Sequence, residues 1–108
     1  MQPPFERIAD LDRLVHEPAR LSILTALSAC KSAEFLFLLR LTGLSKGNLS
    51  SHLTKLEEAG LIVIEKRFTE KIPATSITIT RDGRQQIERH WEKLQKLRLD
   101  ALRWEPEG

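Results

Sequence analysis

Apolar residues along the first half of this chain recur every three or four positions, which is the spacing of amphipathic helices. The pattern predicts four helices, at about residues 5–15, 18–29, 32–42 and 45–59. Pro18 suits the start of the second helix, because its φ is fixed and its missing N–H needs no partner there. We expect Ser32 and Ser45 to cap the third and fourth helices. Gly43 is expected to end the third helix in a left-handed conformation.

After Gly60 the spacing of apolar residues falls to two, which is typical of strands. Two strands are predicted, at residues 61–68 and 75–80, with the polar residues between them forming an exposed hairpin loop. Thr80 is expected to cap a final helix that runs to about Trp104. Gly83 in its first turn lowers the helix propensity of that segment.

This order of elements predicts a mainly α fold with a small β-hairpin, in the α+β class, followed by a long C-terminal helix. We expect one domain over residues 1–108, because a chain of 108 residues rarely forms a second core. Within it we distinguish an N-terminal helix (1–15), a core (18–80) and a C-terminal helix (81–104).

The third and fourth helices, joined by a short turn at Gly43, have the form of a helix-turn-helix, and the hairpin that follows makes it winged. At 100° per residue, Leu49, Leu53 and Leu56 share one face of the fourth helix, and small or hydroxyl-bearing residues occupy the other. A helix entering the DNA major groove needs such a face, because the groove admits little extra bulk. We therefore predict DNA contacts from Ser45, Lys46, Gly47, Asn48, Ser50, Ser51, Thr54 and Lys55.

The same face contains poor helix formers, where glutamate or lysine would give a more stable exposed helix. Close approach to a partner surface explains this choice, and a helix surface exposed only to water is the alternative. The hairpin adds Lys66, Arg67 and Lys71, which we expect to contact phosphates or reach the minor groove. The alternative is that the hairpin is simply exposed to water and does not contact DNA.

The stretch from Leu44 to Ile62 follows the pattern Ser-x-x-x-Leu-Ser-x-His-Leu-x-x-Leu-Glu-x-Ala-Gly-Leu-Ile. It resembles the recognition helix and first wing strand of bacterial and archaeal winged helix-turn-helix transcriptional regulators, of the arsenic-repressor-like and multiple-antibiotic-resistance-like groups. Residues 17–24 and 80–84 extend the resemblance to roughly residues 11–91, and it is strongest to small stand-alone regulators. The resemblance implies sequence-specific binding to double-stranded DNA as a homodimer and control of transcription.

The C-terminal helix carries apolar residues at alternating steps of three and four, the spacing of a coiled-coil seam. We predict that this seam, its neighbour Trp91 and an N-terminal apolar patch form a homodimer interface. The predicted interface residues are Phe5, Ile8, Leu11, Ile87, His90, Trp91, Leu94, Leu97, Ala101 and Trp104. The alternative is a helix folded back on its own core. A two-fold dimer would place two recognition helices about one turn of DNA apart and predicts a palindromic operator.

Charge gives little additional support for DNA binding. Seventeen basic and fifteen acidic residues leave a net charge of +2, so the prediction rests on local geometry. The single cysteine, Cys30, fits a reducing cytoplasm, and we expect no secretory signal and no membrane-spanning segment.

Other chemistries have weaker signals in this sequence. Cys30, His16, His52 and His90 match no metal-ligand spacing, so no metal or other cofactor is predicted, and no effector is identified. We expect His52 to be a packed, hydrogen-bonded residue at the edge of the core. An enzyme is disfavoured, because the chain has no phosphate loop, paired carboxylates or nucleophile motif. The competing function is a winged-helix protein-interaction module that does not bind DNA.

Overall fold

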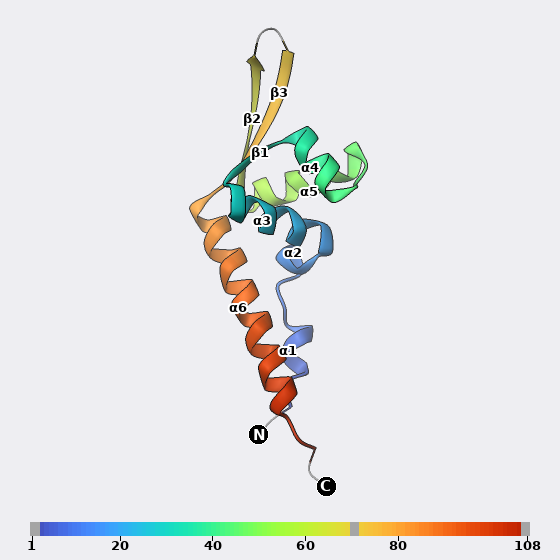
Figure 1. Cartoon of the computed structure of the whole chain (residues 1–108), viewed down its shortest axis with the longest axis vertical. Coiled ribbons are helices and arrows are strands. Elements are labelled where there is room, and N and C mark those ends of the chain that lie inside the picture. The colour runs from blue at the N-terminus through green and yellow to red at the C-terminus, as the bar shows by residue number, and fades with distance from the viewer. Residues whose placement is uncertain (1–2, 70–71, 107–108) are drawn as a thin grey trace.

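Three helices and a three-stranded antiparallel sheet form most of the hydrophobic core of the protein, and Val15 and Ile87 from flanking helices complete it (Figure 1). The computed structural model describes residues 3–69 and 72–106. The helices of the core are α3 (Pro18–Cys30), α4 (Phe35–Thr42) and α5 (Lys46–Glu58), and the strands are β1 (Ser32–Glu34), β2 (Ile62–Thr69) and β3 (Ile72–Ile79). Each helix and both long strands contribute fully buried side chains, including Ile23, Leu24, Leu27, Leu38, Leu49, Leu56, Ile62 and Ile77.

The hairpin β2–β3 and the helix α6 (Arg81–Arg103) project from opposite ends of this core (Figure 1). They stretch the molecule to 69 Å in length, against 26 and 21 Å in the other directions. The hairpin is therefore a wing that extends beyond the helices.

The segment Ser32–Glu34 is a strand, so the prediction that Ser32 caps a helix was wrong. It pairs with β3 in the order β1-β3-β2, with Ser32 opposite Thr78. The hydroxyl of Ser32 lies 3.0 Å from that of Thr78, so this pairing across the strands replaces the expected cap. α4 consequently begins only at Phe35, with no side-chain hydrogen bond at its cap.

The N-terminal segment forms two helices of four residues, α1 (Glu6–Ala9) and α2 (Arg13–His16), and the prediction of one continuous helix was wrong. The carboxylate of Asp12 accepts hydrogen bonds from the backbone N–H groups of Leu14 and Val15. Asp12 is thus an N-cap, which starts a new helix inside the apolar repeat.

Four predicted helix boundaries are confirmed. Pro18 is the first residue of α3. Ser45 caps α5 by accepting from the N–H of Asn48, and Thr80 caps α6 by accepting from that of Gly83. Gly43 ends α4 with φ of 70°, in the left-handed region. At the start of α3, the carboxylate of Glu17 adds a cap that the sequence pattern did not indicate.

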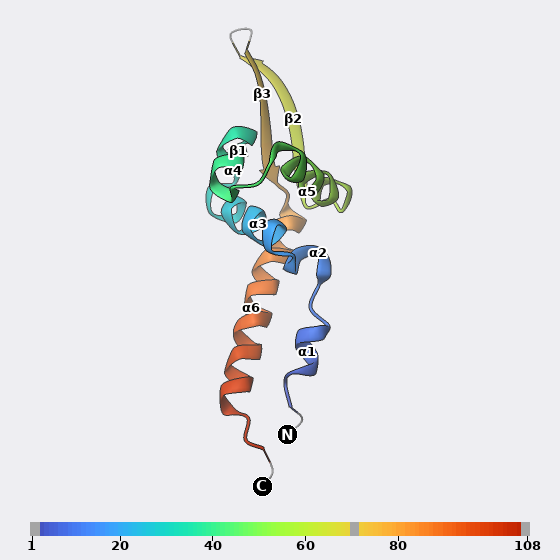
Figure 2. The same ribbon diagram turned by 90° about the vertical axis from the view of Figure 1, so that its right-hand side faces the viewer.

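α1 lies beside the C-terminal half of α6, far from the wing, in both views (Figures 1 and 2). The rings of Phe5 and Trp104 pack edge to face with centroids 5.2 Å apart. Arg7 donates to the carboxylate of Asp100 over 2.6 Å. The N-terminal segment of the chain therefore packs against the C-terminal end of α6.

Candidate nucleic-acid interface

The orientation of α5 follows from its buried stripe. Leu49, Leu53 and Leu56 are packed into the core, which turns the opposite face of the helix to solvent. The structure exposes every α5 residue predicted to contact DNA, together with the capping serine: Ser45, Lys46, Gly47, Asn48, Ser50, Ser51, Thr54 and Lys55. This surface combines small side chains, hydroxyl groups and two lysines, so it can approach a partner closely and donate hydrogen bonds.

A buried arginine anchors α5 to the helices behind it. The guanidinium of Arg20 donates to Nδ1 of His52 over 3.0 Å, and to the backbone carbonyls of Leu14 and Arg13 over 2.7 and 3.3 Å. These bonds tie the middle of α5 to α2 and to the first turn of α3. The predicted role of His52 as a hydrogen-bonded residue at the core edge is confirmed. Arg20 itself was not singled out, because a lone arginine on an apolar helix gives no signal in the sequence.

Glu17, the N-cap of α3, completes this anchor. Its carboxylate oxygen lies 3.6 Å from Nδ1 of His52 and 4.0 Å from Nη1 of Arg20. Burial alone would raise the pKa of Glu17. Hydrogen bonds from the backbone N–H groups of Arg20 and Ala19, together with the charge of Arg20 and the nearby ring of His52, outweigh burial and lower that pKa. The carboxylate therefore stays ionised at neutral pH.

The wing presents Lys66 and Arg67 on opposite faces, because successive side chains of a strand alternate. Lys66 lines a hollow of about 370 Å³ together with Ser50 and Thr54 of α5, so it continues the exposed surface of that helix. The Arg67 guanidinium donates to the carboxylate of Glu65, through Nε over 3.1 Å and through Nη2 over 2.5 Å. Lys71, the third predicted wing contact, lies outside the described residues.

The ten residues predicted at a dimer interface divide into three groups by their exposure. Ile87 is completely buried in the core of its own chain, and Leu11, His90 and Leu97 are also buried within it. Leu94, Ala101 and Trp104 are half-buried, whereas Phe5, Ile8 and Trp91 are exposed. The alternative of a helix folded back on its own chain therefore holds for the buried residues. The exposed residues, and to a lesser extent the half-buried ones, offer surface to a second copy.

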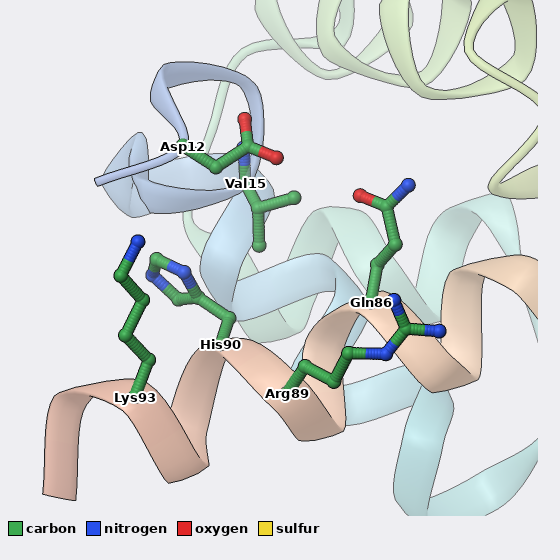
Figure 3. A pocket seen from close by; sticks show the side chains of 6 residues that line it. All are labelled: Asp12, Val15, Gln86, Arg89, His90 and Lys93. Atoms are coloured by element: carbon green, nitrogen blue, oxygen red, sulfur yellow. The ribbon is translucent and has the colours of Figure 1, made fainter. Parts of the chain in front are cut away.

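The buried His90 belongs to a polar cluster between α2 and α6. Nε2 of His90 lies 3.0 Å from Nδ1 of His16, and a hollow of about 310 Å³ beside them is lined by Asp12, Arg89 and Lys93 (Figure 3). Burial is the main cause that lowers the pKa of His90. The charges of His16 and Lys93 add to it, and Asp12 opposes it.

The described residues, 3–69 and 72–106, hold no group of three or more His, Cys, Asp or Glu side chains that could bind a metal ion. Cys30 is an exposed residue at the end of α3. No helix in this part of the chain is both long enough and apolar enough to cross a membrane.

Comparison with known families decides what this arrangement represents. Residues 19–98 match the family of winged helix DNA-binding domains. The chain belongs to this family. The match spans the core, the wing and most of α6.

Individual relatives agree with the family match. The winged-helix chain is 35% identical to an uncharacterized protein of Methanocaldococcus jannaschii over 72 residues, which are 67% of this chain and 78% of the relative. The structure of a transcriptional regulator homologue from Pyrococcus horikoshii OT3 superposes with a TM-score of 0.83 and 27% identity, covering 95% of this chain and all of the other. The structure of overoxidized AbfR bound to DNA gives a TM-score of 0.64 and 26% identity, over 72% of this chain and 56% of AbfR. The protein is thus a winged-helix DNA-binding transcriptional regulator.

Proposed function

We propose that this regulator recognises a specific sequence in double-stranded DNA, with α5 in the major groove. The observation that carries the proposal is the α5 face opposite Leu49, Leu53 and Leu56, on which every predicted contact residue is exposed. Asn48 has the donor and acceptor needed to read the edge of an adenine, and the serines can bond bases or phosphates.

Gly47 supports the same assignment. In the described part of the chain, nothing lies within 4 Å of the position that a Cβ on Gly47 would occupy. The free protein therefore has no packing reason for a glycine inside a helix, where it is unfavourable. A groove that must come close to the helix backbone supplies that reason.

The wing contributes to binding by contacting the phosphate backbone or the minor groove of the DNA. Lys66 shares the hollow beside α5 with Ser50 and Thr54, so a duplex docked on α5 brings a phosphate strand to Lys66. Arg67 lies on the other face, with its charge compensated by Glu65. We therefore assign the phosphate contact to Lys66 and not to Arg67.

The regulator acts as a homodimer on a palindromic operator. On α6, Trp91, Leu99 and Leu102 are 41, 50 and 69% exposed, and they lie within about 80° of one another around the helix. Exposed apolar surface of this kind is typical of interfaces between proteins. Phe5 and Ile8 extend it near the other terminus, and Leu94, Ala101 and Trp104 form its half-buried margin. Because the protein is a regulator that works on DNA, we place it in the cytoplasm.

A salt titration of binding to mixed duplex DNA tests the proposal, followed by selection of bound sequences from a random duplex pool. Phosphate contacts predict a steep fall of log K with log salt, and sequence specificity predicts one enriched palindrome. A protein-interaction module would instead give no duplex binding, or weak binding with no enriched sequence.

A further inference from the structure

Phe68 is the most exposed large apolar side chain in the described residues, with 80% of its surface open to solvent. It lies on β2 in the outer part of the wing, opposite Pro73 of β3. A single exposed apolar side chain needs no partner by itself, but Phe68 lies on the face of the wing that continues the exposed surface of α5.

The face of the wing that carries Phe68 is the face that meets α5. Partners across an antiparallel pair lie on the same side of the sheet, and residues two apart on a strand do too. The pairs Ile64 with Ile77, Lys66 with Thr75, and Phe68 with Pro73 therefore form one continuous face. Its inner end, at Ile64 and Lys66, lines the hollow shared with Ser50 and Thr54 of α5.

The spacing of residues along this face of the wing matches the order in which a duplex presents its phosphate backbone and then its minor groove. At about 3.3 Å per residue, Phe68 lies about 7 Å beyond Lys66 and about 13 Å beyond Ile64. A major groove is about 12 Å wide, so a helix inside it leaves the phosphate backbone and then the minor groove further along the wing. Lys66 meets the backbone, and Phe68 reaches the groove next to it. Figure 2 shows β2 rising beside α5 and extending past it.

We propose that Phe68, backed by Pro73, is a wedge that enters the minor groove of the bound duplex and separates two stacked base pairs. The inference rests on the proposed function, because it places the wing against DNA. Inserted apolar side chains unstack one base step and kink the duplex toward the major groove. The kink would favour easily deformed steps and add sequence preference at positions that α5 does not touch.

The competing explanation is that Phe68 only stabilises the hairpin by cross-strand pairing with Pro73, its partner in the register. Phe68→Thr separates the two, because threonine keeps strand propensity but removes the ring. Phe68→Leu retains an apolar wedge. The matched control is Ile72→Thr, since Ile72 is 67% exposed at the same end of the wing but lies on the opposite face.

The experiment uses the full chain and a duplex chosen by selection, with fluorophores at its two ends and 2-aminopurine in the base steps that the wing would reach. The wild type, Phe68→Leu and Ile72→Thr are expected to shorten the end-to-end distance and brighten 2-aminopurine. Phe68→Thr should leave the duplex straight and 2-aminopurine dim, with affinity about tenfold lower, as expected for the loss of one stacking contact. Its salt dependence should be unchanged, because no charge is removed.

Two results overturn the wedge. Bending by Phe68→Thr equal to that of the wild type removes the ring from the mechanism, and a wild-type complex with straight DNA removes the kink. In both cases the steep salt dependence of the wild type remains, so the proposed function stands. Failure of the wild type to bind duplex DNA would reject the proposed function itself and the wedge with it.

Discussion

Gly83 and Leu61 touch backbone to backbone where α6 leaves the sheet. A Cβ added to Gly83 would overlap the carbonyl oxygen of Leu61, and the same oxygen accepts a hydrogen bond from the N–H of Thr80. The sequence pattern indicated only that Gly83 weakens the helix. The structure shows that Gly83 allows α6 to begin directly against Leu61, in the turn between α5 and β2.

Gly83→Ala should therefore destabilise the protein by about 3 kcal/mol or more, since the neighbouring group is backbone and has little room to move. Gly47→Ala is the matched control, because a Cβ at Gly47 meets open space. It should stabilise the free protein by about 0.5–1 kcal/mol through helix propensity and still weaken DNA binding. Urea unfolding measures the free energy of unfolding of both variants. Equal effects of Gly83→Ala and Gly47→Ala on that free energy would contradict the close backbone contact at Gly83.

The two neighbouring cations of the wing should behave differently. Lys66→Ala is expected to weaken specific and non-specific binding alike and to reduce the slope of log K against log salt by about one, the effect of one lost phosphate contact. Arg67→Ala should leave that slope unchanged, because Glu65 already pairs with the guanidinium. A change of slope confined to Arg67→Ala would place the other face of the wing on DNA.

Stability should fall in mild acid because of His90. Folding lowers its pKa below the ordinary value of 6.5, so between these two values the unfolded chain holds a proton that the folded chain lacks. The contribution is therefore fully present above pH 6.5 and is lost as the pH falls toward the lowered value. Urea unfolding of the wild type and of His90→Gln between pH 5 and 8 tests this. A wild-type curve no steeper than that of the variant would count against it.

Dimer formation should depend on the exposed side chains of α6. A Leu99→Glu, Leu102→Glu double variant is expected to remain folded by circular dichroism, to sediment as a monomer and to lose most operator affinity. Leu97→Glu is the contrasting variant, because Leu97 is buried within its own chain and its replacement should unfold the protein. A double variant that sediments like the wild type would place the interface elsewhere.

Local signals accounted for the parts of the fold that the sequence predicted. The cap at Ser45, the stop at Gly43 and the leucine stripe of α5 each depend on residues within one or two turns, so the recognition helix and its exposed face could be predicted. The exposure of that face has the same origin, since burying one stripe of a helix turns the opposite one outward.

Long-range contacts explain what the sequence did not reveal. β1 is three residues long, and its partner Thr78 lies far along the chain, so Ser32 looked like a helix cap. The coiled-coil spacing in α6 identified an apolar face but not its partner, and Ile87 packs into its own core. Arg20 gained its role only when folding brought His52 beside it.

The central claim is that the exposed face of α5 reads double-stranded DNA, and Ser51→Glu tests it most directly. Ser51 is exposed on that face, away from the leucine stripe, so the variant should keep its free energy of unfolding within about 0.5 kcal/mol. Ser51→Gln, similar in size but neutral, separates the effect of charge from that of bulk. Fluorescence anisotropy with the selected duplex should show an affinity loss of more than about tenfold for Ser51→Glu, because the added carboxylate meets bases and phosphates at close range. The loss for Ser51→Gln should be smaller. A folded Ser51→Glu protein that binds the duplex as tightly as the wild type would contradict the account.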